Sequence, residues 1–303
     1  MSEIAKGHLA MLLFSGLVAG SFSLGGMAAN HIDPVALNIA RFLVAALIVG
    51  AFTMVTQGIT RASLNAPWRY LVLGGVFATY FVLMFYGLKT APPVSAAAVF
   101  TLTPLMAGVA GWLILRQITT PYMALALAIG ATGALWVIFR ADIVALLQFR
   151  VGSGEIVYFW GCVAHAVYIP LVRLLNRGES AMIFTFWTLV AGMILMVVWG
   201  GWTLVETDWS NLPEIVWVAL IYISVFATAI TFILVQFATL RLPAAKVMAY
   251  TYLTPSWVIL WEIALGHGAP PVWILGGVTL TIVALLMLLR QESQPLPKTA
   301  PRA

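Results

Sequence analysis

The sequence predicts an all-α polytopic membrane protein with ten transmembrane helices, arranged as two inverted repeats of five helices each. Of its 303 residues, 62% are hydrophobic and 8% are charged, whereas an ordinary soluble domain has about 25% charged residues. The chain contains ten apolar runs of the length that crosses about 30 Å of hydrocarbon. A repeat with an offset of 151 positions places Pro92 on Pro243, and Leu102-Thr103-Pro104 on Leu253-Thr254-Pro255.

The expected helices follow one another with short connections. Their spans are 8–27, 35–56, 68–88, 93–115, 121–139, 155–174, 181–202, 214–238, 244–265 and 271–290. A proline stands at or near the start of seven of them, where the missing N–H costs nothing. These prolines are Pro34, Pro67, Pro93, Pro121, Pro213, Pro243 and Pro271.

The first run has an alternative interpretation as a signal peptide, because Lys6 precedes it and small residues follow at Ala28 and Ala29. The run is long for the apolar core of a signal, and its Phe14-Ser15-Gly16 matches Phe159-Trp160-Gly161 when the halves are overlaid. We therefore interpret it as a structural first helix.

The basic residues in the loops predict the orientation. With the N-terminus in the cytoplasm, the inner side holds Lys6, Arg61, Arg69, Arg116, Arg173, Arg177, Arg241, Lys246, Arg290, Lys298 and Arg302, and the outer side holds Lys89, Arg140 and Arg150. Eleven against three favours cytoplasmic N- and C-termini.

The longest connection, about Arg140 to Gly154, divides the chain into two halves. We expect a first repeat over residues 1–145, a second over 146–290, and a polar, proline-rich cytoplasmic tail over 291–303 that is disordered. Because five is odd, the second repeat enters the membrane from the opposite face. Such inverted repeats can exchange roles, which is the basis of alternating access in transporters.

The fourth and ninth helices each carry a proline well inside the span, Pro104 and Pro255. A proline there removes one backbone hydrogen bond, so we expect free carbonyls at Phe100 and Thr251, at equivalent depths. Broken helices in matched positions of two repeats surround the substrate site in many transporters. We predict that these four residues form a pair of hinges beside a central cavity.

Three motifs carry a resemblance to a known family. They are Asp33-Pro34-x-x-Leu37-x-x-x-Arg41-Phe42 in the second helix, Tyr80 through Tyr86-Gly87-Leu88 with Ala91-Pro92 before the fourth, and the two Leu-Thr-Pro turns. On these motifs the chain resembles the drug/metabolite transporter superfamily, in its ten-helix form made of two EamA-type repeats. It departs from the pattern at Arg116-Gln117, where the family often has an acid. Within the superfamily the nearest likeness is to the YddG-type exporters of aromatic amino acids, which implies export across the inner membrane of a bacterium.

His165 lies about ten residues into the sixth helix, near the middle of the membrane at 1.5 Å per residue. Ionisable groups at that depth are candidates for function. With Gly161, Cys162 and Tyr168 it forms the more polar face of this helix. We expect this face to line the cavity; the alternative is a neutral histidine bonded to a neighbouring carbonyl.

Arg41 lies about two turns into the second helix. It either snorkels or ties the helix to its neighbours, or it attracts the carboxylate of a substrate. On the eighth helix Ser224, Thr228 and Thr231 form a narrow polar stripe, which either packs helices together or lines the cavity.

With the 151-residue offset, Thr228 and Thr231 fall on Phe77 and Tyr80 of the third helix, and Tyr250 falls on Val99. Phe77, Tyr80 and Tyr250 are therefore further candidates for the lining of the cavity. Most of the twelve tryptophans lie near the predicted interfaces, where aromatic belts are normal. Among the deeper ones, Trp160 beside the polar face of the sixth helix is the candidate for substrate binding.

The residues exclude several other classes of function. No Gly-rich run precedes a Lys-Ser/Thr pair, so the chain has no ATP-binding loop, and no His/Glu motif of the metalloprotease type occurs. A single cysteine and scattered acids predict no metal or other cofactor, and the net charge of +5 belongs to membrane loops rather than to a nucleic-acid surface.

We therefore expect an exporter of small metabolites, above all aromatic or apolar amino acids, that works without ATP and without a catalytic site. It would sit in the bilayer as a monomer, with a dimer as the alternative. A multidrug or nucleobase exporter of the same fold is the second interpretation, and a membrane-embedded enzyme or scaffold is the third.

Overall fold

The computed structural model describes residues 2–59, 61–117, 120–147 and 151–290. The predicted tail, 291–303, lies outside the described residues. The first five spans are α1 (Glu3–Ala28), α2 (Pro34–Thr56), α3 (Trp68–Leu88), α4 (Pro93–Phe100) with α5 (Thr103–Leu115), and α6 (Pro121–Ile138). A short 3-10 helix, η1 (Arg61–Leu64), precedes α3.

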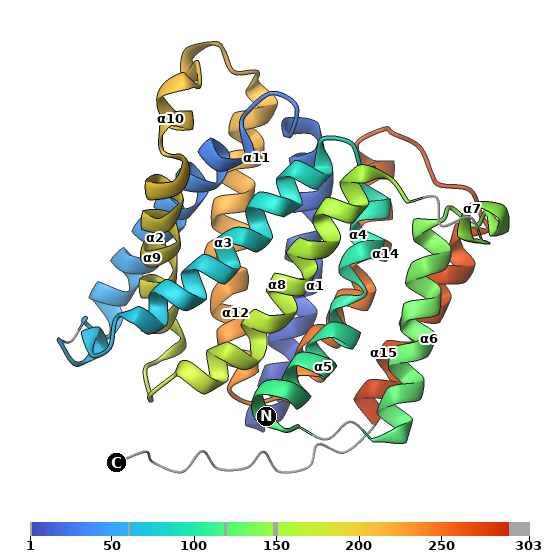
Figure 1. The fold of residues 1–303 in the computed structure, drawn as a ribbon, viewed down its shortest axis with the longest axis horizontal. Helices are drawn as coiled ribbons and strands as arrows, with labels where there is room; N and C mark the ends of the chain where they lie inside the picture. Colours follow the sequence, from blue (N-terminus) through green and yellow to red (C-terminus); the bar gives the residue numbers. More distant parts are fainter. Residues whose placement is uncertain (1, 60, 118–119, 148–150, 291–303) are drawn as a thin grey trace.

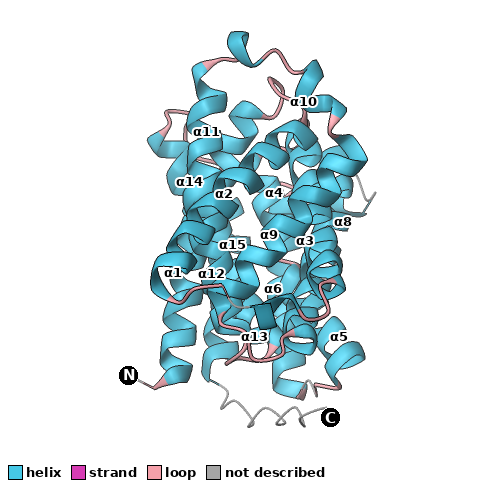
Figure 2. Cartoon of the chain, turned by 90° about the vertical axis from the view of Figure 1, so that its left-hand side faces the viewer, coloured by secondary structure: helices cyan, strands magenta, loops and turns pink. Residues whose placement is uncertain are grey.

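The second five spans follow the short helix α7 (Ile143–Leu147). They are α8 (Ser153–Leu175), α9 (Ala181–Gly200), α11 (Glu214–Ser224) with the π-helical turn η3 (Val225–Ile230) and α12 (Thr231–Thr239), α13 (Ala244–Ala249) with the 3-10 turn η4 (Tyr250–Leu253) and α14 (Thr254–Ala264), and α15 (Ile274–Arg290). Two short helices, α10 (Trp202–Glu206) and η2 (Trp209–Asn211), lie between α9 and α11. Figure 2 shows only helices and loops in the described chain.

Local sequence explains where the helices begin. Asp33 caps α2 by accepting hydrogen bonds from the N–H groups of Val35 (2.8 Å) and Ala36 (3.3 Å), and Pro34 is the first helical residue. At α1, Ser2 caps the N–H of Ala5, so the helix begins five residues before the expected start. The last helix begins three residues later than expected, at Ile274, because a turn on the carbonyl of Pro271 precedes it.

Ten membrane spans follow from these helices, as the sequence predicts. Eight are helical segments that are long and apolar enough to cross a bilayer, and the fourth of them contains a turn between α4 and α5. The ninth span is interrupted by η4, and the tenth, α15, is a shorter apolar helix of 17 residues. In Figure 1, α1 begins and α15 ends at the same end of the bundle, as an even number of crossings requires.

Contacts between helices repeat when the two halves are exchanged. Three spans of the first repeat contact the equivalent span of the second repeat: α2 contacts α9, α4–α5 contacts α13–α14, and α6 contacts α15. The other contacts come in pairs: α3 packs on α8 as α11–α12 packs on α1, α3 packs on α9 as α11 packs on α2, and α5 packs on α8 as α14 packs on α1. This pattern is that of inverted repeats related by a twofold axis in the membrane plane.

Two glycines allow α6 and α15 to approach closely. A Cβ atom on Gly133 would lie 2.5 Å from the carbonyl oxygen of Gly277, and one on Gly277 would lie 2.6 Å from the carbonyl oxygen of Gly133. Small residues of this kind let the backbones of membrane helices pack against each other. The backbones of α6 and α15 are therefore in direct contact at Gly133 and Gly277.

Candidate functional site

Aromatic side chains from several helices surround His165 at the centre of the bundle. Its ring centroid lies 4.4 Å from that of Tyr80 and 5.4 Å from those of Phe77 and Phe100, in each case edge to face. Phe77 in turn contacts the rings of Tyr168 (4.5 Å) and Phe232 (4.1 Å). We call these six residues the central aromatic cluster: Phe77, Tyr80, Phe100, His165, Tyr168 and Phe232.

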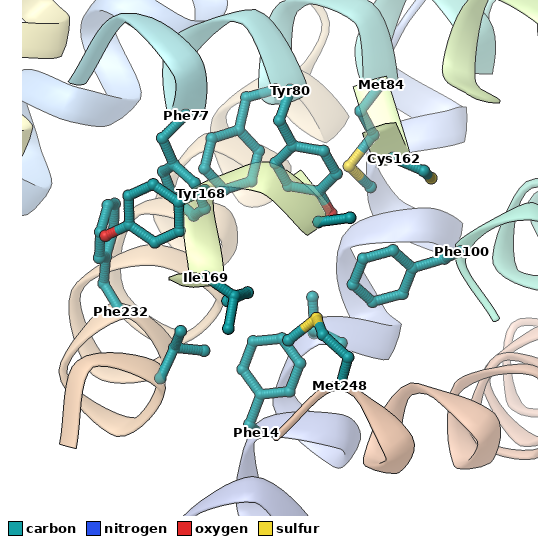
Figure 3. Close-up of a cluster of buried hydrophobic side chains, with 14 of the residues drawn as sticks. Phe14, Phe77, Tyr80, Met84, Phe100, Cys162, Tyr168, Ile169, Phe232 and Met248 are labelled. Atoms are coloured by element: carbon teal, nitrogen blue, oxygen red, sulfur yellow. The ribbon is translucent and has the colours of Figure 1, made fainter. Parts of the chain in front are cut away.

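The cluster joins the two repeats. Phe77 and Tyr80 come from α3 and Phe100 from the end of α4, whereas His165 and Tyr168 come from α8 and Phe232 from α12. Figure 3 shows Phe14 of α1 and Met248 of α13 facing the same space. The structure thus brings together Phe77, Tyr80, His165 and Tyr168, four of the residues that the sequence singled out, at the contact between the halves.

His165 is buried, with 1% of its surface exposed, and neither ring nitrogen has a hydrogen-bond partner in the described part of the chain. The alternative of a histidine bonded to a neighbouring carbonyl is therefore not what the structure shows. Buried polar groups are nearly always paired, and an unpaired one in a native fold calls for an explanation. A substrate that supplies the missing partner is one explanation.

The tyrosine hydroxyls of this region have partners that the sequence interpretation missed. Tyr80 and Tyr158 lie with their hydroxyl oxygens 3.2 Å apart, and the amide nitrogen of Gln236 donates to the hydroxyl of Tyr168 at 2.8 Å. Spacing could have identified Tyr158, which lies seven residues before His165 on the same helix face. Gln236 lies eight residues after Thr228, about 80° around a regular helix, so spacing alone did not point to it. The amide oxygen of Gln236 has no partner among the described residues.

A small cavity lies beside the cluster. Its walls are formed by Phe14, Val18, Phe77, Tyr80, Phe81, His165, Ala227, Thr231, Phe232 and Val235. It leaves a volume of about 10 Å³ for the centre of a water molecule, which is room for about one water. The centre is therefore closed in this conformation, and a substrate would enter only after the rings move apart.

Arg41 is fully buried and does not snorkel. Its Nε donates to the hydroxyl of Thr228 and its Nη2 donates to the carbonyl of Ala227 at 2.9 Å, so it ties α2 to the turn η3. The guanidinium carbon also lies 3.6 Å from the centre of the Phe81 ring.

The predicted polar stripe of the eighth span divides into three environments. Thr231 lines the small cavity, and Thr228 contacts Arg41. Ser224 is buried, and its hydroxyl has no partner in the described chain. The π-helical turn between them adds a residue to the span, which changes the spacing that a regular helix would give.

Two candidates lie away from the cluster. Trp160 is 61% exposed and lies five residues before His165, which turns it about 140° around the helix, away from the cluster. Tyr250 is buried but meets a different partner, with its hydroxyl 3.0 Å from Nδ1 of His8 near the beginning of α1.

Both proline breaks form where the sequence predicts, but their carbonyls are not free. The carbonyl of Phe100 accepts a hydrogen bond from the hydroxyl of Thr103, and that of Thr251 accepts one from the N–H of Thr254 within the 3-10 turn. Hydroxyl capping and tightening of the last turn are the usual ways to satisfy such groups. The two breaks also meet, since the hydroxyls of Thr103 and Thr251 lie 3.2 Å apart.

A second, open hollow lies at the end of the bundle opposite the start of α1. Its volume is about 590 Å³. It is lined by Asn30, His31, Ile32, Asp33, Thr203, Glu206, Thr207, Asp208, Asn211, Leu212 and Pro213. The lining comes from the connection between α1 and α2 and from the segment between α9 and α11, which both lie at that end.

The site offers no set of metal ligands in the part of the chain that the structure describes, where no three His, Cys, Asp or Glu side chains gather. Ten apolar spans in two inverted repeats, closed around an aromatic and polar centre, define a membrane transporter. The chain belongs to the EamA-like transporter family, whose model matches residues 5–139 and 152–290.

Individual relatives agree with this membership. The chain is 26% identical over 283 residues to the uncharacterized transporter YyaM of Bacillus subtilis (strain 168), covering 92% of each chain. It is 20% identical over 293 residues to an uncharacterized transporter of Archaeoglobus fulgidus, covering 96% of this chain and 99% of the relative. One crystal structure shares the fold, with a TM-score of 0.70 at 21% identity over 95% of this chain and 96% of that one.

Proposed function

We propose that this transporter exports amino acids with aromatic or apolar side chains across the inner membrane of a bacterium, with both of its termini in the cytoplasm. The observation that carries the proposal is the central aromatic cluster, in which an unpaired histidine lies among rings from both repeats. Rings bind an apolar side chain through buried area and edge-to-face contacts. Unpaired polar atoms beside them receive the polar end of the same molecule.

The binding mode follows from the contacts. The substrate's side chain would lie between Phe77, Tyr80 and Phe232, in the place that the small cavity marks. Its ammonium or carboxylate group would meet the ring nitrogens of His165 and the hydroxyl of Thr231. In this proposal the substrate is carried across the membrane without any chemical change.

Alternating access supplies the movement. The two repeats pack through equivalent contacts, so an exchange of their conformations would close one end of the bundle and open the other. The sequence contains no ATP-binding loop, and we propose that the substrate moves down its own gradient. The hinges would be the two breaks, with Phe100 and Pro104 in one and Thr251 and Pro255 in the other.

Purified protein in liposomes tests this proposal. Labelled tryptophan, phenylalanine and methionine should enter protein-containing vesicles faster than empty ones, with saturation as the concentration rises. Labelled glutamate and lysine are the matched controls, since their charged side chains do not suit a wall of rings. No flux of the three apolar amino acids would refute the proposal, and flux of a nucleobase or a dye alone would support the second interpretation instead.

A further inference from the structure

Arg41 is a cation in the interior of the membrane, and no residue that the structure describes forms an ion pair with it. None of its surface is exposed, and it lies seven residues after the first residue of α2, about 10 Å along the helix axis. The third nitrogen of its guanidinium, Nη1, has no hydrogen-bond partner in the described parts of the chain. The four ion pairs found among the described residues join other groups, and none involves Arg41.

The existing contacts only partly compensate the charge. A hydroxyl, a carbonyl and the face of Phe81 all attract a guanidinium, but each is neutral. A buried charge without a partner of opposite sign destabilises the folded state relative to an apolar residue of similar volume at the same position. A methionine or leucine would pack α2 against η3 at lower cost, so the charge itself points to an anionic ligand.

Two residues connect Arg41 to the central cavity. Phe81 lines that cavity and also stacks on the guanidinium, and Ala227 lines it and also accepts a hydrogen bond from Nη2. The Phe81 ring therefore stands between the cation and the space beside the central aromatic cluster. Ser224, whose hydroxyl is buried and unpaired, lies one turn before Thr228 on the same span and adds a donor in this region.

We propose that Arg41 is the binding residue for a carboxylate on the substrate, reached when the Phe81 ring moves aside, with Thr228 and Ser224 as neutral hydrogen-bonding neighbours. The inference rests on the proposed function and narrows it: the substrate class is an aromatic or apolar molecule with a free carboxylate. An amine without a carboxylate, or an uncharged nucleobase, lacks the group that this site requires. Arginine binds a carboxylate through two parallel N–H···O contacts, which an amide cannot reproduce.

A series of four ligands tests the requirement by binding to the detergent-solubilised full chain, measured as thermal stabilisation. The ligands are phenylalanine, phenylalaninamide, phenethylamine and 3-phenylpropionate. We expect phenylalanine and 3-phenylpropionate to stabilise the protein and the two ligands without a carboxylate to bind at least about tenfold more weakly. Equal binding of phenylalanine and its amide would overturn the inference and leave the proposed function standing.

Binding of 3-phenylpropionate can support the carboxylate site even where the proposed function fails. If it binds and phenylalanine does not, the carboxylate site stands and the amino-acid exporter is refuted. Since this comparison uses the parent protein, it does not depend on whether any variant folds.

Variants then assign the carboxylate to its residue. Arg41→Met should lower the affinity for phenylalanine by roughly tenfold to a hundredfold and make the acid and the amide bind alike. Arg241→Met is the matched control, because Arg241 also lies over a phenylalanine ring, 3.5 Å from the centre of Phe237, but pairs with Glu3 at the surface. Retention of the preference for the acid in a folded Arg41→Met protein would overturn the assignment.

Discussion

The guanidinium of Arg69 lies 2.6 Å from the carboxylate of Glu179, and this ion pair joins the first repeat to the second. The Arg69 side chain is buried, with 1% of its surface exposed, and that of Glu179 is mostly buried, with 10% exposed. Arg69 also donates to the carbonyls of Leu175 (2.6 Å) and Asn65 (2.9 Å). The pair lies at the end of the bundle at which α1 begins, whereas the opposite end holds the open hollow.

Substitution of Glu179 should weaken this contact between the repeats. Glu179→Gln keeps the shape of the side chain but leaves a buried arginine without its counter-charge, which costs about 3 kcal/mol. We expect a lower melting temperature in detergent and greater access of solvent to the loop between α2 and α3. The control is Glu3→Gln. The Glu3 side chain, which forms ion pairs with Lys6 and Arg241, is 57% exposed, and exposed ion pairs contribute about 1 kcal/mol or less to stability. Equal losses in the two variants would contradict a special role of Glu179.

Acid should weaken the same contact between the repeats. Burial raises the pKa of Glu179, but hydrogen bonds from Arg69 and from the backbone N–H of Arg177 outweigh burial, and the pKa lies below its usual 4.5. A carboxylate with a lowered pKa in the fold stabilises it fully above the usual value, and the contribution is lost as the pH falls through the lowered pKa. The parent should therefore lose more stability than Glu179→Gln when the pH falls below 4.5, in melting curves taken from pH 7 to 3. Parallel curves would exclude Glu179 as the titrating group.

Replacement of His165 separates binding from packing. In His165→Phe a slightly larger apolar ring takes the same place beside the small cavity, and two unpaired polar atoms, each costing about 1 to 3 kcal/mol, are removed. We expect a melting temperature equal to or above that of the parent, together with a flux reduced by about tenfold, since the polar partner of the substrate is gone. Flux at the parent level would assign His165 to packing alone.

The two proline breaks should act as hinges with opposite effects. Pro104→Ala and Pro255→Ala each restore an N–H at a break and favour a straight helix. Because inverted repeats exchange conformations between the two states, the first substitution should favour one open end and the second the other. The measurement is labelling of a single cysteine in the cavity wall (Thr231→Cys, with Cys162→Ala) by an impermeant reagent from each side of oriented vesicles.

The control for the hinges is Pro121→Ala. Pro121 is the first residue of an unbroken helix, so its replacement should leave both labelling rates unchanged. If Pro104→Ala and Pro255→Ala are labelled at the same rates as the parent, the two prolines have a structural role and are not hinges.

The close contact of α6 with α15 should be sensitive to a single methyl group. Gly277→Ala places a Cβ 2.6 Å from the carbonyl oxygen of Gly133, so the helices must separate, at a cost of about 1 to 3 kcal/mol. The adjacent Gly276→Ala is the control, because its Cβ meets nothing nearer than 3.8 Å and alanine favours a helix by up to about 1 kcal/mol. Melting temperatures measure both. A Gly277→Ala protein as stable as Gly276→Ala would contradict the contact.

Sequence alone predicted the spans and the breaks because both depend on local features. Apolar length determines which segments cross a bilayer, and Pro104 and Pro255 remove the same hydrogen bond in any context. The satisfied carbonyl of Phe100 was also within reach of prediction, since Thr103 of the Leu-Thr-Pro turn is the residue that caps it.

The exact lining of the site depended on tertiary contacts. Trp160 and Gly161 are adjacent in sequence, yet one faces outward and the other packs on α3, because one residue turns the helix by about 100°. The buried Arg41 likewise bonds to the π-helical turn η3, at the place where α2 packs against the eighth span. No periodicity in a single sequence reports such a turn.

The closed centre has a consequence for the cell's energy supply. A proton crosses a protein along a chain of hydrogen-bonded waters or side chains, and a volume of about 10 Å³ admits about one water. Beside the rings of Phe77, Tyr80 and Phe232, this conformation therefore leaves no room for a chain of several waters. Each charge that leaked would dissipate about 2.3 kcal/mol per 100 mV of membrane potential. Close aromatic packing at this point of the bundle therefore opposes proton leakage in the closed conformation.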